Sequence, residues 1–355
     1  MIRVYTSITK SYIPKARVLA KSLKRFHPDW EFNVVFSDTL PLSFDLTKEP
    51  FDSVTLIDEF EIPDKEQWIF KHSIVELCTA VKGFMGERLC ARPNTDAVIY
   101  LDPDIMIFNS LEPLIEMLDE YDILLTPHLT HNEGISDRNP EPIENELTAL
   151  KYGVYNLGFY AVKPEGQGLE FVKWWSNRLH FFCDENWREG LFTDQKWCDI
   201  APGLFSKLGI IHDPGYNTAT WNLKYRPISK RKGIFYAGDK PLRFYHFTGY
   251  DSGKGLVQLK KVPSYKNAKK LWDIYDKELK ANGHGDEDFN HWHYNYFNNG
   301  EKITKEMRRL FRAWDIQDNF KKPFHTEGNS FFNWFYSDNY KKNKENYSKF
   351  QLNDI

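Results

Sequence analysis

Apolar residues in the first half of the chain follow two alternating spacings. Short apolar runs predict β-strands over residues 2–6, 31–37, 54–57, 98–101 and 123–126. Between these runs, apolar or small residues recur every three or four positions, which predicts helices over residues 13–26, 68–90 and 111–118. An alternation of strands and helices is typical of an α/β fold with a mostly parallel, doubly wound sheet.

The second half of the chain continues this alternation and then changes in composition. We predict a polar loop over 130–146, strands over 154–162 and 242–248, and helices over 168–182 and 193–200. After about residue 255, Lys, Asn and aromatic residues dominate, with helical spacing at 265–279 and 305–314. We therefore expect a folded domain over 1–255, a helical, aromatic-rich appendage over 256–338 and a flexible tail over 339–355.

Two carboxylates follow one of the predicted buried strands. Residues 98–101 read Val-Ile-Tyr-Leu and lead into Asp102-Pro103-Asp104, after which apolar residues return. A hydrophobic strand normally avoids carboxylates, because burying an unpaired charge is costly. On an extended backbone residues i and i+2 point to the same side, so this pair suits Mg²⁺ or Mn²⁺ with a diphosphate supplying further oxygens. The alternative is structural, since tight turns after strands favour Asp and Pro.

Charge and cysteine content narrow the function classes. The formal net charge is −3, whereas nucleic-acid binding needs a basic surface, so we expect no nucleic-acid partner. The four cysteines have no Cys-x-x-Cys spacing, which disfavours a zinc site or a redox pair and indicates reduced thiols. No signal peptide is recognisable, and no apolar run reaches the ~20 residues of a membrane span. We predict a cytoplasmic protein whose C-terminal region is a candidate for peripheral contact with the inner membrane face or a biosynthetic complex.

Four short motifs occur along the chain in a diagnostic order. They are Tyr100-Leu101-Asp102-Pro103-Asp104, then Tyr155-Asn156-Leu157-Gly158-Phe159, then Asp194-Gln195, then His246-Phe247-Thr248-Gly249. Together they resemble the GT-A-fold nucleotide-sugar glycosyltransferases, above all the retaining family-eight enzymes and related bacterial polysaccharide transferases. The resemblance spans residues 1–255 and implies a Rossmann-like, mostly parallel central sheet flanked by helices.

The resemblance implies a metal site made of Asp102, Asp104 and His246. In the family these residues hold Mn²⁺, or Mg²⁺, against the donor diphosphate. Such an ion neutralises the negative charge that develops as the diphosphate leaves. His246 also stands in an aromatic strand pattern, so a histidine at the edge of the core is the alternative.

The resemblance also implies which residues surround the donor sugar. Asn156 would line the sugar site, and Gly158 would let the backbone approach the donor closely. Asp194 would contact sugar hydroxyls. Gln195 would lie near the anomeric carbon, where a neutral amide stabilises an oxocarbenium-like state rather than attacking it. The structural alternatives are a bulge or turn at Asn156 and a helix N-terminus capped by Thr193.

Other donor and acceptor contacts follow from the same resemblance. Besides Asp102 and Gly158, the implied donor-binding residues are Tyr5, Thr6, Ser7 and Tyr12 near the nucleotide, Lys82 where the family carries an Arg, and Gly249 and Lys254 near the diphosphate. A solvated loop lysine is the alternative for Lys254. The implied acceptor-side residues are Asn217, Trp221 and Asn222, since amides and indole faces suit sugar hydroxyls and CH faces; a well-packed loop is the alternative.

These motifs predict a metal-dependent glycosyltransferase. It would move a sugar from a nucleotide-sugar, UDP-linked by preference, to a saccharide or lipid-linked saccharide acceptor. Retention at the anomeric carbon and a place in the synthesis of a capsule-like or O-antigen-like surface polysaccharide follow from the resemblance. The competing hypothesis is a non-catalytic, transferase-like module that binds sugar or acts as a scaffold. A metal-dependent phosphohydrolase is disfavoured, because it would need further paired carboxylate and histidine motifs.

Overall fold

The computed structural model describes residues 1–133, 143–285 and 291–342, and its centre is a seven-stranded sheet. The strand order is β3 (Ser53–Leu56), β2 (Glu31–Phe36), β1 (Ile2–Ile8), β4 (Ala97–Leu101), β7 (Tyr155–Val162), β6 (Ile123–Pro127) and β8 (Leu208–Ile210). Neighbouring strands run parallel except where β7 pairs with β4 and β6. The predicted α/β fold with a mostly parallel sheet is thus confirmed.

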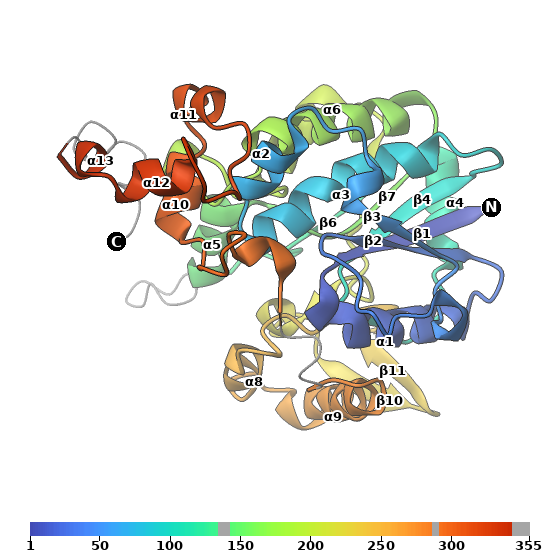
Figure 1. Cartoon of the computed structure of the whole chain (residues 1–355). Helices are drawn as coiled ribbons and strands as arrows, with labels where there is room; N and C mark the ends of the chain where they lie inside the picture. The colour runs from blue at the N-terminus through green and yellow to red at the C-terminus, as the bar shows by residue number, and fades with distance from the viewer. Residues whose placement is uncertain (134–142, 286–290, 343–355) are drawn as a thin grey trace.

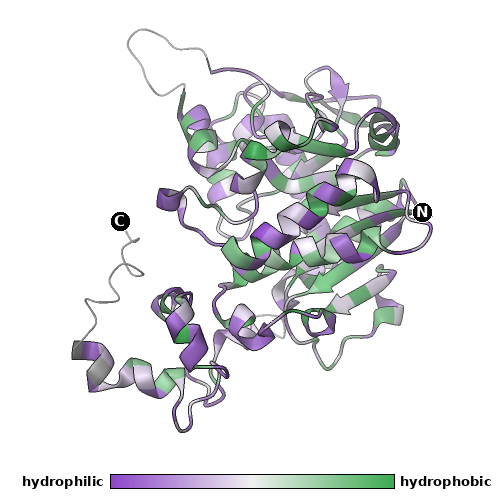
Figure 2. Ribbon diagram, turned by 90° about the horizontal axis from the view of Figure 1, so that it is seen from above, coloured by the Kyte–Doolittle hydropathy of each residue, from purple (hydrophilic) through white to green (hydrophobic). Residues whose placement is uncertain are grey.

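Helices cover both faces of the sheet (Figure 1). On one face, α1 (Ile13–Lys24) and α4 (Glu112–Glu120) pack against strand residues such as Val4. On the other face, α3 (Ile74–Cys90) and α6 (Gly166–Phe182) pack against residues such as Tyr5. Figure 2 shows the sheet strands as largely hydrophobic and the helices as two-sided. The split of neighbouring positions between two cores follows from the two-residue alternation of a strand.

The predicted helix over residues 68–90 is wrong in one respect, because the chain forms two helices there. Helix α2 (Lys65–Phe70) ends before Ser73, and α3 begins at Ile74. The Ser73 hydroxyl accepts a hydrogen bond from the Glu76 backbone N–H, while the Glu76 carboxylate accepts one from the Ser73 N–H. This capping box satisfies the first free donors of α3 and starts a new helix inside the apolar run.

A smaller sheet lies at the carboxyl ends of the main strands. It contains β5 (Ile105–Ile107), β13 (Phe244–His246) and β9 (Thr218–Ala219), in that order. The register of β13 against β5 pairs His246 with Ile105, which brings His246 beside the Asp102–Asp104 turn. Strand β13 is shorter than the predicted strand over 242–248, because residues 242 and 243 connect it to the preceding strand β12 (Lys240–Pro241) and a turn begins at residue 248.

The polypeptide after β13 forms two groups of helices. Helices α8 (Lys254–Leu259) and α9 (Tyr265–Ala281) share a hydrophobic cluster with the strands β10 (Ile228–Arg231) and β11 (Ile234–Ala237). Strand β11 lies between β10 and β12 and pairs with both. The second group is α10 (Lys305–Leu310), α11 (Trp314–Asn319), α12 (Phe331–Tyr336) and α13 (Asp338–Lys342). These helices pack around the Phe70 ring of α2.

Two further predicted helices differ from the structure, and the predicted loop and tail each overlap a helix at one end. The predicted helix over 305–314 is divided into α10 and α11. The predicted helix over 193–200 is a turn followed by a 3-10 helix, Lys196–Ile200, and by α7 (Ala201–Leu204). Part of the predicted polar loop forms α5 (Glu144–Tyr152), and the first residues of the predicted tail lie in α13. Residues 134–142 of that loop and 343–355 of the tail lie outside the described residues.

None of the helices in the described ranges combines the length and apolar composition that crossing a bilayer requires.

Candidate active site

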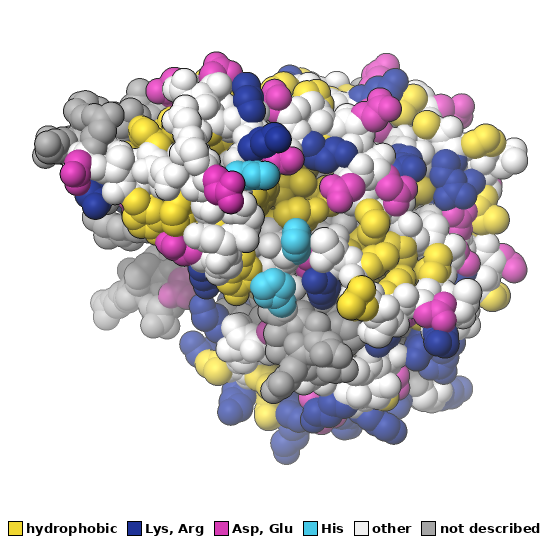
Figure 3. Space-filling view, viewed as in Figure 1, with side chains coloured by type: hydrophobic (Ala, Val, Ile, Leu, Met, Phe, Trp, Pro, Cys, Tyr) yellow, Lys and Arg dark blue, Asp and Glu magenta, His cyan; other side chains and the backbone are white. Residues whose placement is uncertain are grey.

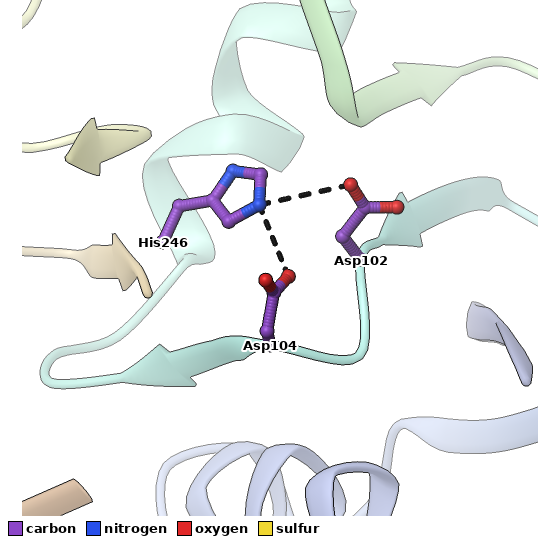
Figure 4. A group of neighbouring side chains, drawn as sticks. All are labelled: Asp102, Asp104 and His246. Atoms are coloured by element: carbon purple, nitrogen blue, oxygen red, sulfur yellow. Dashed lines mark ion pairs between the residues drawn. The ribbon is translucent and has the colours of Figure 1, made fainter. Parts of the chain in front are cut away.

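Two carboxylates and one imidazole meet at the end of β4. The backbone N–H of Ile105 donates to the Asp102 carbonyl (3.1 Å), so Asp102-Pro103-Asp104 forms a tight turn between β4 and β5. The expected extended backbone is therefore wrong, and the turn is what brings the carboxylates together. His246 Nε2 lies 3.0 Å from Asp104 Oδ1 and 3.7 Å from Asp102 Oδ2 (Figure 4).

This cluster of Asp102, Asp104 and His246 has the chemistry of a divalent-cation site. Each residue offers one ligand atom, and the three atoms lie within 4.8 Å of one another. Burial raises the pKa of Asp104, but the neighbouring His246 lowers it to about 2. Burial alone would lower the pKa of His246. The two carboxylates more than offset this effect, so the pKa of His246 is raised. Two carboxylate oxygens and one imidazole nitrogen form a mixed donor set that suits Mn²⁺, or Mg²⁺ with more oxygen from a ligand.

Gly158 leaves the space that such an ion needs. A Cβ atom at this position would lie 2.6 Å from His246 Cε1 and 2.8 Å from Asp102 Oδ2. The Asp102 backbone N–H donates to the Gly158 carbonyl (2.8 Å), which ties the turn to β7. The residues present therefore fit a small metal ion, and a side chain on β7 at this point would collide with its ligands.

Lys82 links the cluster of Asp102, Asp104 and His246 to a further carboxylate, that of Asp194. Its Nζ atom lies 2.9 Å from Asp194 Oδ2 and 3.3 Å from Asp102 Oδ1. Burial lowers the pKa of Lys82, but the two carboxylates more than offset this and raise it, so the ammonium is charged. The Tyr100 hydroxyl also donates to Asp102 Oδ1 (2.6 Å). The site thus contains one permanent buried cation between two acids.

A tight turn carries Asp194 and Gln195 into the site. Thr193 has a positive φ of 45°, which is rare for a β-branched residue, and it does not cap a helix. Asp194 is buried, and burial raises the pKa of its carboxyl while Lys82 opposes that rise. Gln195 Nε2 donates to the Tyr152 carbonyl (2.9 Å), which holds the amide group at the edge of the site.

A cavity of about 440 Å³ brings most of the predicted site residues together. The predicted residues that line it are Ser7, Tyr12, Lys82, Asp102, Asp104, Asn156, Gly158, Asp194, Gln195 and His246. They come from the end of β1 and the 3-10 helix after it, from α3, from the turn after β4, from the start of β7, from the turn at 193–195 and from β13. Ligands of α/β sheets bind at this edge, because the carboxyl ends of parallel strands meet there.

Several predicted site residues lie outside the lining of this cavity. Tyr5 is fully buried, and its hydroxyl donates to the Lys82 carbonyl (2.7 Å), so it supports α3 from below the site. Thr6 is also fully buried, in the interior of β1. Gly249 takes a positive φ of 75° in the loop before α8, and Lys254 is exposed at the first residue of that helix.

The three predicted acceptor-side residues lie near His246 but in different roles. The Trp221 ring packs edge-on against the His246 ring, with the ring centroids 5.5 Å apart. Asn222 is buried and accepts from the Ala219 backbone N–H (3.0 Å), so it holds its own loop. Asn217 is buried directly behind His246.

Some residues of the site were not predicted from the sequence. Thr79, Phe192 and Thr248 line the cavity, and His128 lies behind it next to Asn156. His128 follows the last residue of β6, so its place after a strand was a usable signal. Thr79 stands three residues before Lys82 on α3, which places both on one helix face.

No protein-family model matches the chain. It is 29% identical to YfnF of Bacillus subtilis (strain 168) over 177 residues, which is 49% of this chain and 57% of YfnF. It is 23% identical to YfnD of the same organism over 252 residues, which is 69% of this chain and 76% of YfnD. YfnF and YfnD are both described as uncharacterised proteins. The chain thus spans little more than half the length of YfnF.

Among solved structures, the galactosyltransferase LgtC in complex with donor and acceptor sugar analogues is similar to this chain. The TM-score is 0.45 at 16% sequence identity, over 79% of this chain and 96% of LgtC.

Proposed function

We propose that this protein is a metal-dependent glycosyltransferase that uses a nucleotide-sugar donor. The observation that carries the proposal is the convergence of two half-sites in one cavity. One half offers Asp102, Asp104 and His246 to a divalent cation, and the other offers Asp194 and Gln195. A cation clamp for a diphosphate beside polar groups for a sugar is the chemistry that a nucleotide-sugar needs.

The residues of the cavity have distinct proposed roles. Ser7 near the end of β1 and Tyr12 in the following 3-10 helix, Lys10–Tyr12, would contact the nucleotide. Asp194 accepts hydrogen bonds from sugar hydroxyls, and Gln195 stabilises positive charge at the anomeric carbon. When bound, Mn²⁺ or Mg²⁺ would supply positive charge against the departing diphosphate. Lys82 fixes Asp102 and Asp194 relative to each other.

The finer parts of the proposal concern the donor, the acceptor and the stereochemistry. We infer a UDP-linked donor, a saccharide or lipid-linked saccharide acceptor in surface polysaccharide synthesis, and retention at the anomeric carbon. Retention is inferred from the resemblance of the four motifs alone. Because the amide of Gln195 is a poor nucleophile, a retaining reaction here would use front-face attack by the acceptor hydroxyl rather than a covalent intermediate. Trp221 next to His246 is the proposed acceptor platform.

A ligand screen followed by one substitution tests the proposal. Nucleotide-sugars should raise the melting temperature only with Mn²⁺ or Mg²⁺, because their diphosphates need the cation. Asp102→Asn should then lower the rate of sugar transfer by about 10²- to 10³-fold or more. Asp239→Asn, which removes an exposed carboxylate outside the cavity, is the matched control.

Release of nucleoside diphosphate in the absence of acceptor separates the enzyme from a sugar-binding scaffold. A slow, cation-dependent release from the donor is expected of the enzyme. Donor binding without any release, together with no transfer to any acceptor, would favour the scaffold. An Asp102→Asn variant that transfers sugar at the wild-type rate would overturn the metal-dependent function.

A further inference from the structure

A chain of polar side chains lies behind His246. It links His128 after β6, Asn156 on β7 and Asn217 before β9 to His246 on β13. Asn156 Nδ2 lies 3.2 Å from His128 Nε2, and Asn217 Nδ2 lies 2.9 Å from Asn156 Oδ1. Asn217 Oδ1 lies 3.3 Å from His246 Nδ1. Four separate elements thus meet through side chains alone.

The orientation of the Asn217 amide follows from its partners. Its Nδ2 atom has two hydrogens, and both are used, on Asn156 Oδ1 and on Thr126 Oγ1 (2.8 Å). Its Oδ1 atom therefore faces His246, and a carbonyl oxygen can only accept. The His246 Nδ1 atom must carry the hydrogen of this bond. Asn217 is only 2% exposed, so water cannot easily take its place.

The orientation of the Asn156 amide follows from its hydrogen bonds in the same way. Its Oδ1 atom accepts from Asn217 and from the Gly158 backbone N–H (3.2 Å), so its Nδ2 atom must face His128. His128 Nε2 then acts as an acceptor and carries no hydrogen. Its Nδ1 atom faces the Val154 carbonyl at 3.3 Å and donates to it. Burial lowers the pKa of His128 to about 4, which agrees with a neutral ring.

We propose that His128, Asn156 and Asn217 are positioning residues that hold His246 with its Nδ1 atom protonated and its Nε2 atom free to bind the metal. Nε2 is the atom that faces Asp102 and Asp104. The proposal rests on the metal site of the proposed function and adds what orients its histidine ligand. Hydrogen bonds to the second nitrogen of a histidine fix the ring and its tautomer, and their loss typically costs about 10- to 100-fold in metal affinity.

Binding of Mn²⁺, measured by electron paramagnetic resonance of the free ion, tests this proposal without an activity assay. Asn217→Ala should weaken binding by about 10- to 100-fold, and His128→Phe, three hydrogen bonds away from His246, should weaken it less. Thr218→Val is the matched control. Thr218 is the buried neighbour of Asn217. Its hydroxyl donates to the Pro214 carbonyl (2.7 Å) and takes no part in the hydrogen bonds that lead to His246.

A second readout follows the histidine ring itself. In protein with ¹⁵N-labelled histidine, His246 Nδ1 should carry a hydrogen in the wild type with bound Mg²⁺, and this signal should change in Asn217→Ala. Equal Mn²⁺ affinity in all variants would overturn the positioning role while leaving the metal site intact. No Mn²⁺ binding by the wild type would overturn the metal site, and this proposal with it.

A different observation, the distribution of charge, supports a second inference. Residues 224–280 contain 15 Lys and Arg but only 5 Asp and Glu, whereas the whole chain contains 47 and 50. Figure 3 shows Lys and Arg gathered at the lower edge of the molecule, where Figure 1 places α8, α9, β10 and β11. We call the outward side of these elements the basic face. A basic face on a protein whose net charge is negative favours an anionic partner.

Helix α9 and the β10–β11 hairpin build the basic face together. Exposed residues recur along α9 at spacings of three and four, and all but one are lysines: Lys266, Lys270, Asp273, Lys277 and Lys280. The exposed hairpin tip carries Lys230-Arg231-Lys232. Asn267 on α9 donates to the Ile228 carbonyl of β10 (3.0 Å), which holds the two elements side by side.

We infer that the basic face binds an anionic lipid surface. Apolar side chains stand exposed among its charges, with Ile234 at the hairpin 43% exposed and Val257 on α8 60% exposed. Lysines around exposed apolar residues suit a membrane interface, where the charges meet anionic headgroups and the apolar groups enter the boundary layer. The sequence predicted membrane contact in the C-terminal region; the basic face instead begins within the transferase fold, at β10.

Co-sedimentation with vesicles tests the basic face. Vesicles of phosphatidylcholine with phosphatidylglycerol should bind the protein, vesicles of phosphatidylcholine alone should not, and about 0.5 M salt should release it. Lys230→Gln/Arg231→Gln/Lys232→Gln should lower the bound fraction at least about 10-fold, since each charge contributes separately. Arg88→Gln/Lys173→Gln/Lys207→Gln removes three charges elsewhere and should leave it unchanged. Equal binding to both vesicles, or binding to a soluble polyanion but to neither vesicle, would overturn the inference.

Discussion

Helix α3 contributes to two ion clusters in which one cation stands between two carboxylates, and the clusters differ in what surrounds them. In the site, Lys82 stands between Asp102 and Asp194. At the first turn of α3, Arg312 stands between Glu76 (2.7 Å) and Asp184 (3.2 Å). The second cluster fastens the C-terminal helices to the domain. The first borders a cavity and lies next to Asp104 and His246.

The difference shows how one charge pattern serves two purposes. The Arg312 cluster borders no part of the cavity, and its three side chains pair with one another. The Lys82 cluster has an open side, where Asp102 also belongs to the metal cluster. Lys82 therefore positions Asp102 and Asp194 but leaves a net negative charge in the site, which the proposed cation would balance. Substitutions at the two cations test this contrast.

Replacing the site cation should have the largest effect. Lys82→Met leaves Asp102 and Asp194 buried without a permanent cation, so the free energy of unfolding should fall by about 3–5 kcal/mol. Saturating Mn²⁺ should restore part of this loss, because the ion supplies charge to Asp102. Urea unfolding with and without Mn²⁺ measures both effects. Lys82→Arg, which retains the charge, is the control, and a loss that Mn²⁺ does not reduce would contradict the contrast.

Replacing the structural cation should cost similar stability without a metal effect. Arg312→Met leaves Glu76 and Asp184 without their cation, and we expect a loss of about 3–4 kcal/mol. Mn²⁺ should not restore it, and the folded fraction should bind Mn²⁺ as the wild type does. The same unfolding experiment and a Mn²⁺ titration measure this. Weaker Mn²⁺ binding by folded Arg312→Met would show that the two clusters are not independent.

Acid should weaken the structural cluster in a defined pH window. Burial raises the pKa of Glu76, but Arg312 and other partners lower it from the ordinary 4.5 to about 2. The stabilisation from a lowered carboxyl pKa is present above the unfolded value and is lost as pH falls from 4.5 towards 2. This shift corresponds to about 3 kcal/mol. Urea unfolding between these pH values should show the loss in the wild type, and Glu76→Gln should show a flatter profile.

The smallest expected effect concerns the space beside the metal cluster. Gly158→Ala would add a Cβ atom 2.6 Å from His246 Cε1, so the ring must shift and Mn²⁺ affinity should fall by about 10-fold or more. Gly203→Ala is the matched control, because a Cβ there has no atom within 4 Å. Calorimetric titration with Mn²⁺ measures both variants. An unchanged affinity in Gly158→Ala would mean that the cluster tolerates displacement of His246.

The sequence by itself determined the sheet and the chemistry of its edge. Apolar spacing is a local property, so the strands and most helices could be predicted from it. The Asp-Pro-Asp turn, the Asp194-Gln195 pair and His246 could be named because each stands in a short motif. The residue types of the Asp-Pro-Asp turn indicated a cation, and the resemblance of the four motifs to a known family implied a sugar.

Only the tertiary structure decided how these residues are joined. The register of β13 on β5 brings His246 to Asp104, and the packing of α3 brings Lys82 between Asp102 and Asp194. The hydrogen-bonded side chains from His128 to His246 connect four elements. The motifs of Asn156 and Asn217 did not predict that these two residues belong to this series. Such hydrogen bonds depend on distances between segments remote in the chain, and no local spacing encodes those distances.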